Sequence, residues 1–167
     1  MTEKKGMKCL SFQQPYAAMI AVGAKTVECR SRRIKTPVKD LVICASKTAK
    51  IFYPIPGLVY GYAIGMADIT DCVPFTKKHL PDAVMSGMPE SGCYAWILEN
   101  PRMIRPQPVK ASASFFYTDF TPEILEPTRA AYEKYLLPLA RTGEADEVED
   151  TLHMLFEKQK ELWDAFA

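Results

Sequence analysis

Short segments in the first third of the chain alternate between apolar and polar residues in a way that predicts strands around one short helix. Residues 8–12 form a first apolar segment, and residues 25–30 carry apolar side chains at alternate positions. A period of two is typical of a strand with one buried face. Between them, residues 16–22 are small and apolar, and Gly23 is well placed to cap a helix. We therefore expect a strand, a helix over 16–22 and a second strand, in that order.

The middle of the chain contains longer apolar segments. Residues 40–45 form a continuous apolar run that suits a central strand, and residues 58–70 suggest a long strand bent at its glycines. Proline and glycine interrupt residues 71–91, which we expect to form a long excursion. The clearest strand covers residues 92–99, ended by the following Asn-Pro pair, and an extended stretch covers 107–117. Several short strands, one early helix and no βαβ repeat predict a mainly β fold, a small barrel.

After Phe120 the pattern changes to that of amphipathic helices. A helical stretch is expected to begin near Pro122 and to be interrupted by Pro138. We expect residues 7–120 to form the barrel domain and residues 121–167 a helical extension packed on it. The same apolar stripe also suits pairing with a second copy of the chain, so a homodimer is the alternative. The stripe recurs at steps of three and four residues and comprises Val148, Leu152, Leu155, Phe156, Gln159, Trp163 and Phe166.

Composition places the chain among globular proteins. Hydrophobic residues make up 48% of it and charged residues 25%, which argues against wholesale disorder. There is no run of 18 apolar residues that would form a transmembrane helix. The polar, lysine-rich first residues lack the apolar stretch of a secretory signal. We therefore expect a cytoplasmic protein, or a nuclear one if the host has a nucleus, without contact to a membrane.

The five cysteines favour buried, reduced thiols over a metal site. They are odd in number and widely spaced, and no Cys-x-x-Cys pair is present. The two histidines, His79 and His153, lie far apart in the sequence. These spacings do not match those of zinc sites, so we expect neither a metal ion nor a cofactor.

The net charge of +1 conceals a strong asymmetry along the chain. Residues 1–50 carry 11 Lys or Arg against 3 Asp or Glu, whereas residues 121–167 carry 5 against 11. A basic first third and an acidic last third favour an anionic partner for one end of the chain. The alternative is that the asymmetry has no binding role and the opposite charges only solvate two faces of the protein.

Four motifs in order carry a resemblance to a known family. Residues 23–30 (GAKTVECR) fit G-x-K-x-x-E-x-R, and residues 10–16 (LSFQQPY) fit L-S-x-x-Q-P-W/Y ahead of it. Residues 41–47 (LVICASK) are similar to the next strand of that family, and residues 92–102, followed by Pro-Val-Lys, to its closing strand and turn. The chain thus resembles the ASCH domain family over about residues 7–117. The resemblance implies a PUA-like β-barrel with a cleft for nucleic acid between the barrel and the first helix.

The residues of this region suit RNA or a nucleotide-like ligand. Basic side chains neutralise phosphates, Tyr16 offers a ring for base stacking, and the neighbouring glutamines both donate and accept hydrogen bonds. We expect Lys25 and Arg30 to contact phosphates and Glu28 to orient them or to bind a base. Trp96, which lies among aliphatic residues, is expected in the core. The expected ligand-binding residues are Gln13, Gln14, Tyr16, Lys25, Glu28, Arg30, Arg32, Ser46 and Lys47.

Glu28 leaves an enzymatic alternative open. A carboxylate repels phosphate, so it pairs with a cation, binds a base, or acts as a general acid or base beside Lys25. Some proteins that the chain resembles are amidohydrolases of acylated cytidine. They use a lysine and a threonine three residues later, where this chain has Glu28. Other relatives resemble ribonucleases, for which Ser46 or Tyr94 would serve. The first alternative function is therefore a small hydrolase using Lys25 and Glu28.

Strand geometry bears on this pair. Strict alternation places Lys25 and Glu28 on opposite faces, so they share a cleft only if Lys25 belongs to the turn before the strand. A second alternative is a non-catalytic module whose acidic helical tail binds a protein or covers the basic cleft.

Overall fold

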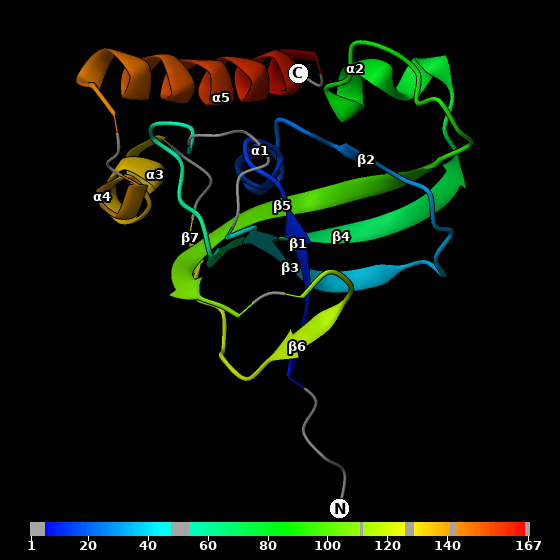
Figure 1. Cartoon of the computed structure of the whole chain (residues 1–167), viewed down its shortest axis with the longest axis horizontal. Helices are drawn as coiled ribbons and strands as arrows, with labels where there is room; N and C mark the ends of the chain where they lie inside the picture. Colours follow the sequence, from blue (N-terminus) through cyan, green and yellow to red (C-terminus); the bar gives the residue numbers. More distant parts are fainter. Residues whose placement is uncertain (1–5, 48–53, 111, 126–128, 141–142, 166–167) are drawn as a thin grey trace, which may run out of the picture.

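The computed structural model describes residues 6–47, 54–110, 112–125, 129–140 and 143–165, with side chains described as far as residue 159. Its strands form one mixed sheet, and its helices lie mainly on one side of that sheet (Figure 1). The elements in chain order are β1 Met7–Phe12, α1 Tyr16–Val22, β2 Val27–Arg30, β3 Val38–Ala45, β4 Tyr62–Pro74, η1 Lys77–His79, α2 Leu80–Ala83, β5 Tyr94–Pro108, β6 Phe116–Thr118, β7 Ile124–Leu125, α3 Arg129–Tyr135, α4 Leu137–Ala140 and α5 Ala145–Ala165.

The sheet is open. Its strand order is β2-β5-β4-β3-β1-β6, and β7 adds to β5. Strands β1 and β3 are parallel, whereas the other pairs are antiparallel. Among the described strands no pairing joins β2 back to β1 or β6. The predicted closed barrel is therefore not confirmed, and the fold is a bent, seven-stranded mixed sheet with helices.

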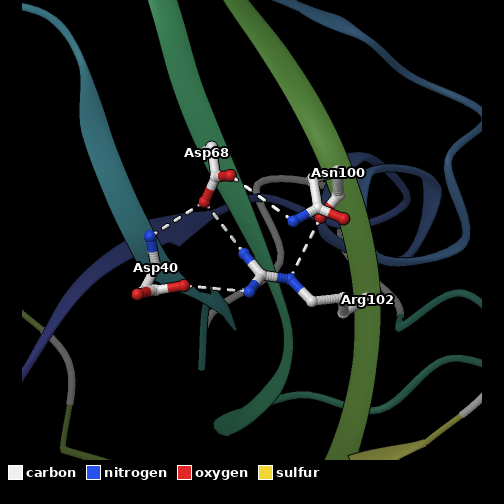
Figure 2. Close-up of polar contacts among 4 residues, drawn as sticks. All are labelled: Asp40, Asp68, Asn100 and Arg102. Carbon is white, nitrogen blue, oxygen red and sulfur yellow. Dashed lines mark hydrogen bonds and ion pairs between the residues drawn. The ribbon is translucent and has the colours of Figure 1, made fainter.

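Strand β5 is longer than the sequence predicts. The expected end at Asn100 is wrong, because the strand continues to Pro108 through an irregular stretch in which Asn100 takes a φ of 55°. A network of side chains spans β3, β4 and β5 at this point (Figure 2). Arg102 donates hydrogen bonds to Asp40 and Asp68, each at 2.9 Å, and the Asp40 amide donates to Asp68 at 2.9 Å. These bonds hold the three strands together where their register shifts.

Helix α1 packs tightly against the sheet. The structure confirms its predicted bounds and the Gly23 cap, which takes a φ of 85°. The helix crosses β4 at Gly65, where an added Cβ atom would lie 2.6 Å from the Ala21 Cβ atom and 2.9 Å from the Arg102 carbonyl oxygen. The small, apolar character of the helix therefore allows this close approach.

The C-terminal helices share the main core with α1 and the sheet. Leu152 and Leu155 of α5 are fully buried in the same cluster as the α1 side chains, and α5 lies over α1 in Figure 1. Tyr132 of α3 donates a hydrogen bond to the Gly57 carbonyl oxygen at 2.9 Å. The stripe leucines thus contact this chain's own core. The Trp163 and Phe166 side chains lie outside the described part. None of the described helices is long and apolar enough to cross a membrane.

Part of the tail differs from its prediction. Residues Ile124–Leu125 do not begin a helix but form β7, which pairs with Met103 and Ile104 of β5. The first described helix after the sheet starts at Arg129, and Pro138 lies inside α4. Residues 124–125 therefore belong to the sheet, because they pair with the free edge of β5.

Candidate functional site

A cleft of about 830 Å³ opens between β1 and β2, two strands that are not paired with each other among the described strands. The start of α1, the residues just after β3 and the segment after β5 complete its walls. The volume falls within the range of roughly 300–1,000 Å³ that is usual for ligand sites. The residues that line the cleft are Ser11, Phe12, Gln13, Tyr16, Glu28, Arg30, Ser46, Lys47, Val109, Lys110, Ser112 and Ala113.

Arg30 of the cleft lining is held by three contacts within the protein. Its Nη2 atom donates a hydrogen bond to the Ser11 carbonyl oxygen at 3.3 Å, and its Nε atom lies 3.7 Å from a Glu28 carboxylate oxygen. The guanidinium carbon is 5.2 Å from the centroid of the Phe12 ring, within cation–π range. These contacts fix the orientation of Arg30 while leaving about a third of its side chain exposed.

Glu28 is a carboxylate in a poorly hydrated position. Its side chain is 14% exposed, yet it lines the cleft. Burial raises its pKa above the ordinary value of 4.5, and the charges of Lys25 and Arg30 oppose that rise. Burial of this kind disfavours the charged form of a carboxyl group, and perturbed acids in clefts are frequent at functional sites.

Lys25 lies behind the cleft wall. It belongs to the turn before β2, as sharing a site with Glu28 requires, but it is only 4% exposed and does not line the cleft. Its ammonium group donates a hydrogen bond to the Ala83 carbonyl oxygen at 2.5 Å and lies 5.0 Å from the centroid of the Tyr16 ring. Burial lowers its pKa, whereas the Glu28 charge raises it. Lys25 thus supports two cleft residues from inside the protein.

The two neighbouring glutamines take different positions. Gln13 lines the cleft, whereas Gln14 is buried and 8% exposed. The side-chain nitrogen of Gln14 donates a hydrogen bond to the Val59 carbonyl oxygen at 2.8 Å. Its side-chain oxygen accepts one from the backbone N–H of Ala18 at 3.0 Å. Both ends of its side chain are therefore used to anchor the start of α1. Tyr16, which follows, lies at the lip of the cleft with 39% of its surface exposed.

The remaining expected residues divide between the cleft and its surroundings. Ser46 and Lys47 line it, whereas Arg32 lies in an adjoining hollow. Tyr94 is outside both linings. Trp96 is 3% exposed, as expected for a core residue, and its indole N–H donates to the Arg32 carbonyl oxygen at 3.0 Å.

Ser11 and Lys110 are among the cleft residues that were missed as candidates from the sequence. The hydroxyl oxygen of Ser11 is buried and has no hydrogen-bond partner among the described residues. A buried hydroxyl without a partner is costly, and this one belongs to a residue of the cleft wall. Lys110 adds a further cation to the lining. The sequence offered a signal for both, because each lies in one of the four motifs.

Comparison with known proteins gives both a family and a fold. Residues 10–108 match the family model of the ASCH domain. The crystal structure of a serine-to-alanine mutant of the ZmASCH protein from Zymomonas mobilis superposes with a TM-score of 0.50 at 19% identity, covering 70% of this chain and 91% of that one. A tyrosine-to-phenylalanine mutant of the same protein gives 0.49 at 21% identity, covering 68% and 91%. No curated protein sequence matches the chain.

Proposed function

Because this chain belongs to the ASCH domain family, whose members are thought to bind RNA, we propose that its cleft binds single-stranded RNA or a nucleotide-like ligand. One observation carries the proposal. The cleft combines exposed cations and an exposed aromatic ring on one continuous surface. Single-stranded RNA offers phosphates, base faces and base edges, and these are the groups that such side chains bind.

Phosphates are the natural ligands of the basic side chains. Arg30, Lys47 and Lys110 line the cleft from three different segments. Cations that surround a hollow hold a phosphate more firmly than cations spread over a convex face, because the surrounding protein focuses their field. We place the phosphate against Arg30, whose guanidinium is already oriented by Ser11 and Glu28.

Base recognition falls to the other side chains. Tyr16 provides the exposed ring for stacking, and Gln13 can bond to base edges or to a ribose hydroxyl. Glu28 accepts hydrogen bonds when ionised and donates one when protonated. Lys25 and Gln14 act indirectly in this proposal, because their polar groups are bonded within the protein.

A titration of labelled oligouridylate by fluorescence anisotropy tests the proposal. Arg30→Gln and Lys47→Gln should each weaken binding, and each should reduce the dependence of log affinity on log salt by about 0.7, the value for one lost single-strand phosphate contact. Arg105→Gln is the matched control, because Arg105 pairs with Glu123 outside the cleft. Equal effects of all three variants, or no binding by the native chain at low salt, would overturn the proposal.

A hydrolase is the second candidate, and the environment of Glu28 favours it. A carboxyl group with a raised pKa in a ligand-sized cleft is a candidate general acid or base. Ser46 lines the same cleft, whereas Lys25 does not. If the site is catalytic, incubation with oligouridylate or an acylated cytidine should yield shorter or deacylated product. Glu28→Gln should then abolish turnover while retaining binding. Intact ligand after prolonged incubation would leave binding as the function.

Other expectations stay predictions. A protein-binding role for the acidic tail, pairing of two chains through the α5 stripe and a cytoplasmic location are not tested by the fold. No described residue of α5 lines the cleft. Because Leu152 and Leu155 are core residues, deletion of the tail is a poor test of its role. Neutralisation of exposed acids such as Asp146 and Glu149 is the better one.

A further inference from the structure

A second, smaller hollow adjoins the cleft. Its volume is about 130 Å³, and Arg30 and Ala113 line both hollows. Ser31, Arg32, Trp96 and Phe115 are among its other lining residues. A volume well below the roughly 300 Å³ of an ordinary ligand site admits only part of a molecule that is bound elsewhere as well.

Aromatic rings and cations continue from the cleft into this hollow. Arg30 stands between them, with its guanidinium carbon 5.2 Å from the Phe12 centroid and 5.6 Å from the Trp96 centroid. The Trp96 ring stacks on Phe115 with an interplanar angle of 9° and a centroid distance of 6.1 Å. Phe115 in turn lies 4.4 Å from the ammonium group of Lys8 and 5.8 Å from the guanidinium carbon of Arg32.

The aromatic ring and the cations of the second hollow are at least partly accessible. Arg32 and Ser31 are exposed, and Phe115 is partly exposed. The buried Trp96 anchors this region from below, through its stacking on Phe115 and its hydrogen bond to the Arg32 carbonyl oxygen. An aromatic face flanked by cations is the arrangement on which a base of a single strand stacks while its phosphate is neutralised.

We propose that the second hollow is a subsite for the neighbouring nucleotide of the same RNA strand, whose base stacks on Phe115 and whose phosphate lies between Arg30 and Arg32. The inference rests on the proposed function of the cleft and makes it more specific. The ligand is then an oligonucleotide and not a free nucleotide. Arg30 contacts the nucleotides in both hollows, which accounts for its place between the Phe12 and Trp96 rings.

Ligand length tests the subsite. Isothermal titration calorimetry should compare uridine monophosphate, a uridine dinucleotide and a uridine hexanucleotide, with native chain and with Phe115→Ala and Arg32→Gln. The native chain should bind the dinucleotide at least about tenfold more tightly than the monophosphate. Both variants should lose most of this gain and retain their affinity for the monophosphate. Arg33→Gln is the matched control, because Arg33 is an exposed neighbour that lines neither hollow.

The outcomes separate the two proposals. Equal affinity of the native chain for all three ligands, or equal effects of Arg32→Gln and Arg33→Gln, overturns the subsite and leaves the cleft as a nucleotide site. Failure of every ligand to bind overturns the proposed function and the subsite together. If Phe115→Ala does not fold, the comparison of the two arginine variants decides, because both residues are exposed.

Discussion

Arg30 of β2 reaches Ser11 of β1 through a 3.3 Å hydrogen bond from its guanidinium group to the Ser11 carbonyl oxygen. The backbones of the two strands are not paired with each other among the described residues. The arginine side chain thus crosses the opening that backbone hydrogen bonds would occupy in a closed barrel. The candidate site lies in this opening, so the incomplete closure of the sheet and the presence of the cleft have one structural origin.

The pH dependence of binding should follow Glu28. Its pKa is raised above 4.5 by burial, and a phosphate bound beside it favours the protonated form further. Affinity for oligouridylate should therefore be highest below the Glu28 pKa and fall as pH rises through it, by about tenfold for a further one-unit shift on binding. Glu28→Gln should remove this step and bind tightly throughout, as measured by anisotropy across the pH range. Glu123→Gln, at an exposed position, should keep the native profile. If the fall in affinity with rising pH survives in Glu28→Gln, another group is responsible for it.

Lys25→Met should change stability and the pH profile together. The substitution leaves the buried Ala83 carbonyl oxygen without its partner, which should cost about 1–3 kcal/mol of unfolding free energy in urea denaturation. It also removes a charge that lowers the Glu28 pKa, so the binding step should move to higher pH. Lys35→Met, at an exposed position, should do neither. An unmoved step would show that Lys25 does not act on Glu28.

Gly65→Ala should destabilise the contact between α1 and the sheet. The new Cβ atom would meet the Ala21 Cβ atom at 2.6 Å and the Arg102 carbonyl oxygen at 2.9 Å. Overpacking of this kind should cost about 1–3 kcal/mol in the unfolding free energy. Gly87→Ala is the control, since no atom lies within 4 Å of its added Cβ. Equal midpoints for the two variants in thermal unfolding would contradict the described packing.

Asp68→Asn should weaken the network of Figure 2 in a pH-dependent way. Although burial opposes ionisation, the Asp40 amide and the Arg102 charge lower the Asp68 pKa below 3.8. The network's contribution to stability is therefore present above about pH 3.8. It is lost as the pH falls through the pKa of Asp68 in the folded protein. The variant should unfold about 1–3 kcal/mol more easily at neutral pH, with a smaller difference in acid. Asp71→Asn, at an exposed position, should match the native chain, and a constant deficit at all pH values would argue against this role for the charge.

Local sequence features predicted the parts of the site that lie in regular structure. Alternation over 25–30 placed Glu28 and Arg30 on one face of a strand, and both line the cleft. The small, apolar pattern before Gly23 predicted the bounds of α1. These features follow from contacts between near neighbours, so a single sequence reveals them.

Features that depend on distant contacts were beyond the sequence. Gln13 and Gln14 are adjacent and identical in type, and only the approach of Val59 decides that Gln14 turns inward. Lys25 is buried because Ala83, far along the chain, offers it a carbonyl group. The open sheet likewise depends on which strands pair, and neither hydrophobic alternation nor a family resemblance fixes that for this chain.

Chemical-shift mapping by NMR tests the central claim most directly. A uridine hexanucleotide should be titrated into uniformly ¹⁵N-labelled native chain at low salt. The account predicts shifts concentrated at the amides of Ser11, Gln13, Glu28, Arg30 and Ser46, which surround the cleft, with the amides of α5 and of the Asp68 network unchanged. Shifts confined to α5 or to the Asp68 network, with the cleft amides unmoved, would contradict the account.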